Sequence, residues 1–538
     1  MSSSPPSANG DSQVSSSTLW SARLLGGLLV GWTFLACLFP LSDFDIWWHL
    51  RAGQLILERG VVPTLDWFTY TNSDRPWIDL HWGFQVLAAW IYGRFGADGL
   101  VAAKAAAIAT AAGIAWSAAG RATPSWVRVL LWIPGLMAIY GRGYERPEVL
   151  SLIFLAAWLW VTVDLDRRMR WTPLLVLVQV LWVNCHSLFV LGLVVGGAAL
   201  GDQALRGWMQ RRGGLERAGL APLTHGRSVW FGVALAVLCV AAGLLNPYGL
   251  QGLLFPEVVY RKFTVEQAFY AARIGEFQRP IEFLRAYGLA SPTLAAELAV
   301  WGLTAASFLL LAIVRRRWHP GRVVLFVAFS HLAWEAARNT NLFCLASTTL
   351  MLANVSDLGR WGERPAAAPW HRGLNVLAGV LLLLGMGAVT TGIWGWWLGG
   401  SKTFGLGERP AWFAHEAARA AGREGFPRRV LAAHFGQAAV YSFHAGPEGR
   451  VFMDGRLEVC SQQTFEEWET IVAQLAVGDR RWEAQHLADY GELPVVLLDR
   501  RECLPQIEAL RRTPGWVEVY SDQTASVFVD EPTARTVR

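Results

Sequence analysis

The chain has 538 residues, of which 53% are hydrophobic and only 17% are charged, and its formal net charge is +5. Soluble proteins carry about 25% charged residues, so this composition, with a mean hydropathy of +0.30, excludes an ordinary soluble enzyme. It favours a multi-pass membrane protein. The arginines lie in short loops between apolar runs, so the positive charge indicates membrane sidedness rather than a nucleic-acid partner.

The N-terminal segment, residues 1–18, is rich in Ser and Pro and carries no Lys or Arg. Such a composition predicts disorder, and the missing basic residues argue against a cleavable signal peptide. We therefore expect the apolar segment that follows to remain as a membrane anchor.

Apolar runs long enough to cross a bilayer recur between residues 19 and 398. They predict a mainly α fold, a polytopic transmembrane helical bundle of about eleven spans. The predicted spans are 22–42, 98–119, 126–141, 148–164, 172–187, 188–204, 229–246, 292–314, 323–337, 340–355 and 373–398. The segment 80–96 is either a twelfth span or a helix that lies at the interface.

Basic residues in the short loops predict the sidedness, because Lys and Arg accumulate in cytoplasmic loops. If segment 80–96 does not cross, the basic loops all fall on the side of the N-terminus; they are 121–128, 166–170, 206–227, 315–322 and 360–372. This topology predicts a cell inner membrane protein with a cytoplasmic N-terminus. The first loop, residues 43–79, and the tail, residues 399–538, would then be extracytoplasmic.

The first outer loop opens with "SDFDIWWHL", which brings Asp43 and Asp45 directly after the first predicted span. A carboxylate there can act as a general base or hold a divalent metal. Asp43 has the alternative of capping the helix that follows. The two tryptophans give that helix an apolar side, so we expect it to lie on the membrane surface, where His49 either binds a phosphate or reaches towards the headgroups. Asp66, before "WFTYT", contacts substrate or forms a turn.

Further polar residues stand at the outer ends of later spans. In "YERPEVL", Arg146 can clamp a phosphate bidentately and Glu148 can complete a carboxylate pair; an ion pair between Arg146 and a neighbouring Glu is the alternative. In "WVNCHS", Asn184 and His186 are functional candidates, with a hydrogen bond between helices as the alternative. Arg338 interrupts an apolar run and is a candidate for an anionic headgroup. Their common side predicts one outward-facing site.

The tail changes to short β-like runs, 428–433, 450–454, 494–499, 516–520 and 526–530, separated by amphipathic segments at 463–475, 481–490 and 502–512. This alternation predicts a small soluble α/β domain. In "FMDGRLEV", the Asp454–Arg456 segment is expected to be a turn after a strand rather than a catalytic group. We expect the tail to cover the outer cavity or to bind the acceptor.

The block "DxDxWWHLxxGxxIxxxGxxPxxDxFxxT", from Asp43 to Thr71, and the layout of spans, first-loop acid, later acidic position and soluble tail resemble the GT-C superfamily of membrane glycosyltransferases. That family includes protein O-mannosyltransferases, aminoarabinose transferases of lipid A and Rgt-like lipopolysaccharide transferases. The resemblance implies transfer of a sugar, with inversion, from a polyprenyl-phosphate donor to a glycan, lipid or protein acceptor. A non-catalytic or transport protein that binds lipid-linked glycans is the alternative.

The resemblance also implies roles for single residues. Asp45, or alternatively Asp43, matches the first-loop acid that serves as catalytic base or metal-linked carboxylate, and Glu148 matches the second acidic position. A divalent ion, Mg or Mn, would be held by Asp45 and Glu148. Together with the outer-face residues above, the expected substrate-binding set is His49, Asp66, Arg146, Asn184, His186 and Arg338.

Overall fold

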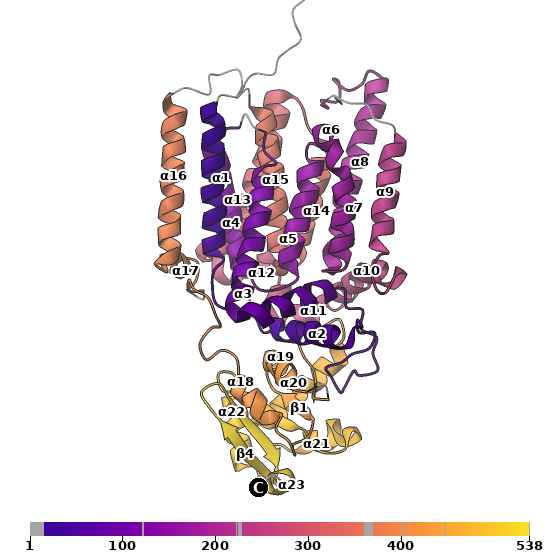
Figure 1. Ribbon diagram of the computed structural model, residues 1–538, viewed down its shortest axis with the longest axis vertical. Coiled ribbons are helices and arrows are strands. Elements are labelled where there is room, and N and C mark those ends of the chain that lie inside the picture. The colour runs from indigo at the N-terminus through magenta and orange to yellow at the C-terminus, as the bar shows by residue number, and fades with distance from the viewer. Residues whose placement is uncertain are drawn as a thin grey trace, which may run out of the picture.

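The computed structural model describes residues 16–536, apart from 121–122, 222, 224–228, 360–368, 401 and 447. A bundle of long helices carries a smaller α/β domain, the tail, at one end (Figure 1). Of the segment predicted to be disordered, residues 1–15 lie outside the described part, and the remainder belongs to α1 (Ser16–Ala36). Parts of three predicted basic loops also lie outside it.

Every predicted span overlaps a helix of the bundle. Besides α1 these are α3 (Trp82–Trp116), α4 (Ser125–Gly141), α5 (Glu148–Thr162), α7 (Thr172–Val183), α8 (Val190–Arg211), α9 (Val229–Gly243), α13 (Pro292–Arg315), α14 (Pro320–Glu335), α15 (Thr340–Leu358) and α16 (Pro369–Thr390). Short helices α6 (Leu165–Arg168), η1 (Met169–Trp171) and η2 (Ser187–Phe189) join some of them. The bundle therefore has the mainly helical architecture that the sequence predicts.

Fewer helices are long enough to cross a membrane than overlap a predicted span. Within the described residues, four helices are long and apolar enough to cross a membrane: Trp82–Trp116, Ser187–Arg211, Pro292–Arg315 and Trp370–Thr390. A fifth candidate is the pair Glu148–Thr162 and Leu165–Val183, which is bent by 99°. The predicted count of about eleven spans thus stays a prediction.

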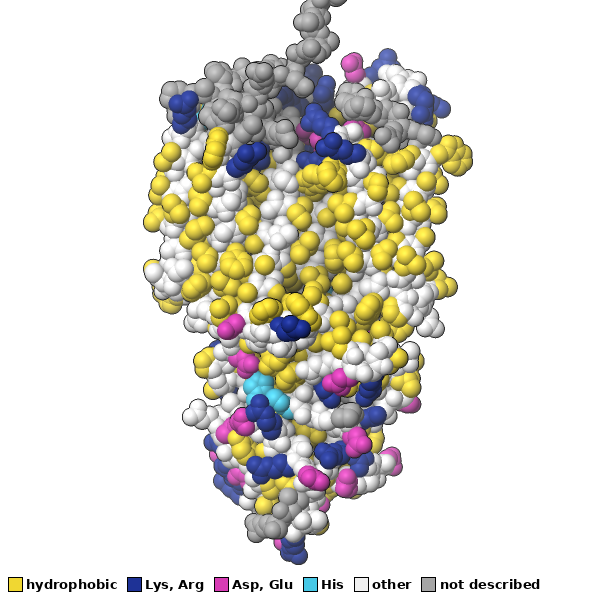
Figure 2. Space-filling model, viewed as in Figure 1, with side chains coloured by type: hydrophobic (Ala, Val, Ile, Leu, Met, Phe, Trp, Pro, Cys, Tyr) yellow, Lys and Arg dark blue, Asp and Glu magenta, His cyan; other side chains and the backbone are white. Residues whose placement is uncertain are grey.

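The outside of the bundle is apolar over its middle part (Figure 2). Large side chains such as Leu309, Ile313 and Leu384 are exposed there, and Lys and Arg gather at the rim away from the tail. Contiguous exposed apolar surface of this kind marks contact with lipid or a partner. The belt suggests a multi-pass membrane protein, while the identity of the membrane and the orientation in it stay predictions.

Helix α3 is broken at Gly96, whose φ of 62° and ψ of −156° are not helical. Its first part lies with α2 (Asp45–Arg59) across the end of the bundle, between the bundle and the tail (Figure 1). The expectation that α2 rests on the membrane surface needs correction. Trp47 is buried and packs against Phe413 and Phe443 of the tail, so tail side chains rather than lipid cover the apolar side of α2.

Several short helices complete this end of the bundle: α10 (Leu250–Val265), α11 (Gln267–Ala271), η3 (Gly275–Phe277), α12 (Pro280–Tyr287), η4 (Gly288–Ala290), η5 (Ala337–Asn339) and α17 (Ile393–Trp397). The last predicted span, 373–398, is interrupted. Gly392 takes a left-handed conformation with φ of 81°, which ends α16 and starts α17 in a new direction.

The tail is built on a five-stranded sheet in the order β2-β1-β3-β5-β4. Its strands are β1 (Arg429–Ala432), β2 (Arg450–Val451), β3 (Val495–Asp499), β4 (Trp516–Ser521) and β5 (Ala525–Asp530), and each coincides with a predicted β run. β1 is parallel to β2 and β3, and β5 is antiparallel to β3 and β4. The helices are α18 (His415–Ala421), α19 (Phe435–His444), α20 (Gln462–Ala476), α21 (Arg481–His486), η6 (Ala488–Tyr490), α22 (Leu504–Arg512) and α23 (Glu531–Thr536).

Candidate functional site

A group of charged side chains, here called the charged cluster, lies where the ends of several bundle helices meet the tail. Its members come from the α1–α2 junction, the α4–α5 connection and the short helices η3 and η5. They are Asp43, Asp45, Arg142, Arg146, Glu148, Glu276 and Arg338. Five of them were predicted from the sequence, and the structure brings those five together from segments almost 300 residues apart.

Arg146 is the centre of the charged cluster. Its guanidinium pairs with Asp43, lies 3.1 Å from Asp45 Oδ2 and lies 2.9 Å from Glu276 Oε2. The alternative considered for Arg146, a pair with a neighbouring Glu, is not formed with Glu145, which pairs with Lys104 at 2.6 Å. A fork of N–H donors suits several carboxylates at once, so Arg146 fixes the two first-loop acids relative to η3.

Asp43 contacts both the start of α2 and Arg146, and its predicted role as base or metal ligand stays a prediction. Its Oδ1 accepts the backbone N–H of Asp45 at 2.9 Å, at the first turn of α2. The same carboxylate pairs with Arg146. Because both oxygens are engaged, Asp43 orients Asp45 and Arg146 rather than facing an open space.

The two remaining acids around Arg146 differ in their protonation. Burial raises the pKa of Asp45 to about 7 against the lowering effect of Arg146, and the charges of Asp43 and Glu276 add to the rise. At Glu276 burial also raises the pKa, but Arg146, Arg142 and Arg338 outweigh it and hold it at about 2. Near neutral pH, Glu276 is therefore a fixed charge, while Asp45 can take up and release a proton.

Three groups in the charged cluster lack a hydrogen-bond partner in the described part of the chain, and one of them is the buried Nε of Arg142. Within the described part of the chain, the guanidinium of Arg338 makes no hydrogen bond or ion pair; it lies 4.8 and 4.4 Å from the ring centres of Phe263 and Phe277. One carboxylate oxygen of Glu148, Oε1, is buried without a hydrogen bond. Buried polar groups are nearly always satisfied, so Glu148 and Arg142 indicate a place for water or a ligand, and the partly exposed Arg338 is open to the same space.

The predicted divalent metal at Asp45 and Glu148 does not fit the arrangement of the side chains. Among the described residues, no three His, Cys, Asp or Glu side chains are grouped so that they could hold a metal ion. Arg146 already supplies positive charge to Asp43, Asp45 and Glu276. A metal bound by these carboxylates would have to displace that guanidinium.

Three other predicted binding residues lie beside the charged cluster, in contacts within the fold. His49 is buried with its ring 3.5 Å from that of Trp48. His186 Nδ1 lies 3.0 Å from Ser151 Oγ on α5, which is the contact between helices considered as its alternative. Asn184 Oδ1 accepts the indole N–H of Trp82 at 2.9 Å. As the side chains are placed, these residues join helices, and their predicted roles with substrate stay predictions.

Asp66 and the "DGR" segment of the tail meet in a second buried group. Arg456, with 0% of its side chain exposed, lies 2.7 Å from Asp66 Oδ1 and 2.8 Å from Asp454 Oδ2. The interpretation of residues 454–456 as an ordinary turn is therefore incomplete, because the turn carries a buried ion pair with the first loop. Asp66 lies outside the charged cluster.

The sequence did not point to Glu276, Arg142 or Gly455 as parts of the site. Glu276 stands in the long stretch after "NPYG", where no motif marks it. Arg142 stands four residues before Arg146 in "GRGYERPE", but the two lie in the non-helical connection between α4 and α5, so no helical period relates them. Gly455 is identified only by the structure, through its contact with Asp45, which is described below.

No protein-family model and no curated protein matches this sequence. Solved structures do match. The oligosaccharyltransferase AglB of the archaeon Archaeoglobus fulgidus, in complex with an inhibitory peptide and a dolichol-phosphate, has a TM-score of 0.51 at 12% identity over 90% of this chain and 69% of that chain. The same protein tethered to an acceptor peptide gives 0.53 at 11% identity, over 96% and 74%.

A third structure of that oligosaccharyltransferase, in complex with Zn and sulfate, has a TM-score of 0.51 at 12% identity and covers 90% of this chain and 68% of that chain. At such identities the likeness is one of fold. The chain thus shares the fold of that oligosaccharyltransferase, which fits the GT-C-like fold that the sequence led us to expect.

Proposed function

We propose that this protein is an integral-membrane glycosyltransferase that moves a sugar, with inversion, from a polyprenyl-phosphate donor to an envelope acceptor at the outer face. The observation that carries the proposal is that one charged cluster, at the end of an apolar bundle, holds both a cation without an ion-pair partner, Arg338, and a carboxylate poised near pH 7, Asp45. The archaeal protein of the same fold binds a dolichol-phosphate, which supports a donor of this class.

Arg338 is the residue that we expect to bind the donor phosphate. The guanidinium of Arg338 lies over the rings of Phe263 and Phe277, which leaves its N–H donors for an anion. A hydrogen bond between ionised partners is roughly twice as strong as one between neutral groups. The polyprenyl tail would remain among the apolar side chains that the bundle exposes.

Asp45 is the residue that we expect to act as general base. The oxygen of an acceptor hydroxyl attacks the anomeric carbon from the face opposite the phosphate, and its proton passes to the Asp45 carboxylate. The bond between that carbon and the phosphate oxygen breaks, and the phosphate leaves with the electron pair. Arg338 stabilises the negative charge that develops on the phosphate.

The remaining members of the charged cluster keep this arrangement rigid. Arg146 fixes Asp45 against Asp43 and Glu276, and Arg142 lies 3.2 Å from the same Glu276 oxygen. Donor phosphate and base are thereby held on elements from four parts of the chain. Such positioning accounts for a large part of enzymatic rate enhancement.

The test uses purified protein in lipid vesicles, radiolabelled undecaprenyl-phosphate hexoses as donors and a cell-envelope extract as acceptor. Wild type is compared with Asp45→Asn and Asp43→Asn. We expect label transfer by wild type, and its loss in Asp45→Asn with donor binding retained. Tight donor binding without transfer by wild type would instead favour the non-catalytic or transport function.

A further inference from the structure

The tail touches Asp45 through the carboxylate oxygen that Arg146 does not hold. A Cβ built on Gly455 would lie 2.6 Å from Asp45 Oδ1, whereas Arg146 lies 3.1 Å from Oδ2. Contacts of Cβ atoms are essentially never that short, so a side chain at residue 455 would displace the Asp45 carboxylate or the turn itself. Asp45 keeps 26% of its side chain exposed, which is the edge that remains open to an acceptor.

Arg456, next in the chain, is anchored more firmly than a turn residue needs to be. Asp454 receives N–H groups from its guanidinium through both carboxylate oxygens. The guanidinium lies 4.8 Å from the ring centre of Phe68 and 4.5 Å from that of Trp77. Removing one partner of such a buried pair leaves an uncompensated charge, so the turn is bound to the first loop.

The first loop is joined to the edge strand β2 of the tail's sheet by an isolated parallel bridge, Thr69 to Val451. Val451 in β2 donates its N–H to Phe68 O at 2.8 Å and accepts from Tyr70 N at 3.0 Å. Asp66, the partner of Arg456, accepts the backbone N–H groups of Phe68 and Thr69 at 3.0 and 2.9 Å. The loop that carries Asp45 at its start and the turn that carries Gly455 are thus one rigid unit.

We propose that the turn Asp454–Gly455–Arg456 forms the wall of the site at Asp45, and that Arg456 is the positioning residue that holds this wall in place. The inference rests on the proposed function, because it gives the tail a role in presenting the base, Asp45, to the acceptor. The acceptor hydroxyl then reaches Asp45 along the exposed edge between Gly455 and Arg146.

The contact between the wall and residue 45 can be tested without an activity assay. Asp45→Cys is labelled with a maleimide in vesicles, and the modification of residue 45 is followed by peptide mass spectrometry. We expect slow labelling in Asp45→Cys and labelling at least ~10-fold faster after the additional change Arg456→Gln, because the buried ion pair is lost. Arg511→Gln, which removes an exposed pair with Glu518 in the same domain, is the control and should leave the rate unchanged.

Transfer assays then test the consequence for chemistry. Gly455→Ala should lower the turnover rate ~10²-fold, since a displacement of about 1 Å suffices for such a loss, while the concentration of undecaprenyl-phosphate hexose at half-maximal rate stays the same. Gly446→Ala is the matched control, because no atom lies within 4 Å of a Cβ built there. Arg456→Lys, which keeps the charge, should recover part of the rate lost in Arg456→Gln.

The two sets of results separate the wall from the proposed function. Equal labelling rates at residue 45 with and without Arg456, or full turnover in Gly455→Ala, would overturn the wall. Faster labelling in Arg456→Gln together with absent transfer in wild type would support the wall as a structural element and refute the proposed function.

Discussion

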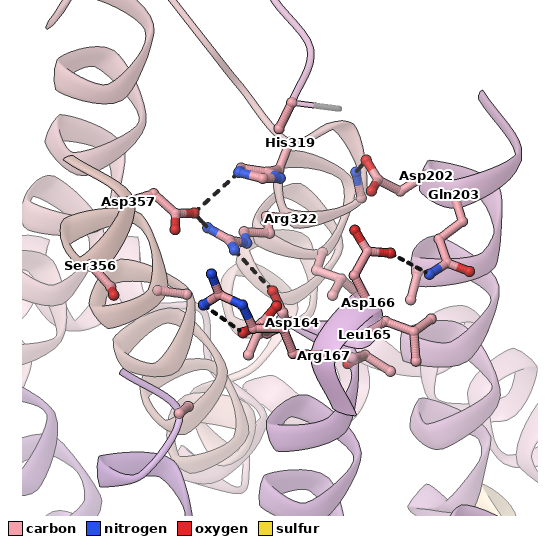
Figure 3. A pocket seen from close by; sticks show the side chains of 18 of the residues that line it. Asp164, Leu165, Asp166, Arg167, Asp202, Gln203, His319, Arg322, Ser356 and Asp357 are labelled. Atoms are coloured by element: carbon pink, nitrogen blue, oxygen red, sulfur yellow. Dashed lines mark hydrogen bonds and ion pairs between the residues drawn. The ribbon is translucent and has the colours of Figure 1, made fainter. Parts of the chain in front are cut away.

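The two ends of the bundle both carry clusters of Asp and Arg, and they differ in how those charges are satisfied. At the end away from the tail, a cavity of about 170 Å³ is lined by α6, α8, α14 and α15 (Figure 3). Arg322 lies 2.7 Å from Asp357, and Arg206 lies 2.7 Å from Asp202. Among the described residues that line it, no buried side-chain atom is left without a hydrogen bond.

The charged cluster at the end next to the tail differs, because some of its polar groups are not satisfied. Glu148 and Arg142 each keep a buried atom without a hydrogen bond there, and Arg338 has no ion-pair partner among the described residues. The comparison teaches that the two clusters differ in how fully their polar atoms are satisfied, and a buried atom without a partner needs water or a ligand. The cavity end is expected to hold helices together, and the cluster end is expected to do chemistry.

The sharpest way to break this comparison is to change one carboxylate at each end. Asp45→Asn should lower transfer by ~10²–10⁴-fold, the contribution of a positioned general base. Asp357→Asn, which loses its contacts to Arg322 and His319, should retain transfer and only melt at a lower temperature. A loss of transfer of similar size in both variants would mean that the two ends do not differ in function.

The cations of the two ends allow the same contrast for binding. Arg338→Gln should weaken binding of undecaprenyl phosphate by ~10–100-fold, because hydrogen bonds to charged groups contribute about 1.5–3 kcal/mol each. Arg206→Gln, at the cavity, should leave the dissociation constant unchanged. Binding is measured by titration of vesicle-embedded protein, and undiminished affinity in Arg338→Gln would remove Arg338 as the phosphate residue.

The pH dependence of transfer distinguishes the ends through protonation. The base must be ionised, and burial raises the pKa of Asp45 to about 7, so transfer should fall about tenfold for each pH unit below that value. Because the charge of Asp43 contributes to the rise, Asp43→Asn should move the midpoint to lower pH in whatever activity remains. A rate that is flat between pH 5 and 8 would exclude Asp45 as the base.

Hydropathy determines how much of the site could be predicted from the sequence. Apolar runs fix where helices end, so residues at successive ends on one side, such as Asp45, Arg146 and Arg338, could be expected to meet. The direction of each side chain is not encoded in this way. His186 contacts Ser151 and Asp66 contacts Arg456. Both partners lie on other elements of the fold, which hydropathy does not identify.

The fold shows the same division. Helices and strands were predictable from period and composition, whereas their breaks and contacts depended on single residues. Gly96 turns α3 across the end of the bundle, and Trp47 of α2 meets Phe413 of the tail rather than lipid. Both outcomes depend on tertiary packing, which overrides local patterns.

The smallest expected effect concerns the cavity end alone. Arg322 joins α14 to α15 through Asp357 and Asn354, and to the end of α5 through the backbone oxygen of Val163 at 2.9 Å. Arg322→Gln should therefore lower the melting temperature by only a few degrees, with turnover and donor affinity unchanged at temperatures below melting. Thermal unfolding in vesicles, with transfer measured on the same samples, provides the check. If Arg322→Gln reduced turnover while the protein stayed folded, the cavity would communicate with the charged cluster along α5, which ends beside Arg322 and begins at Glu148.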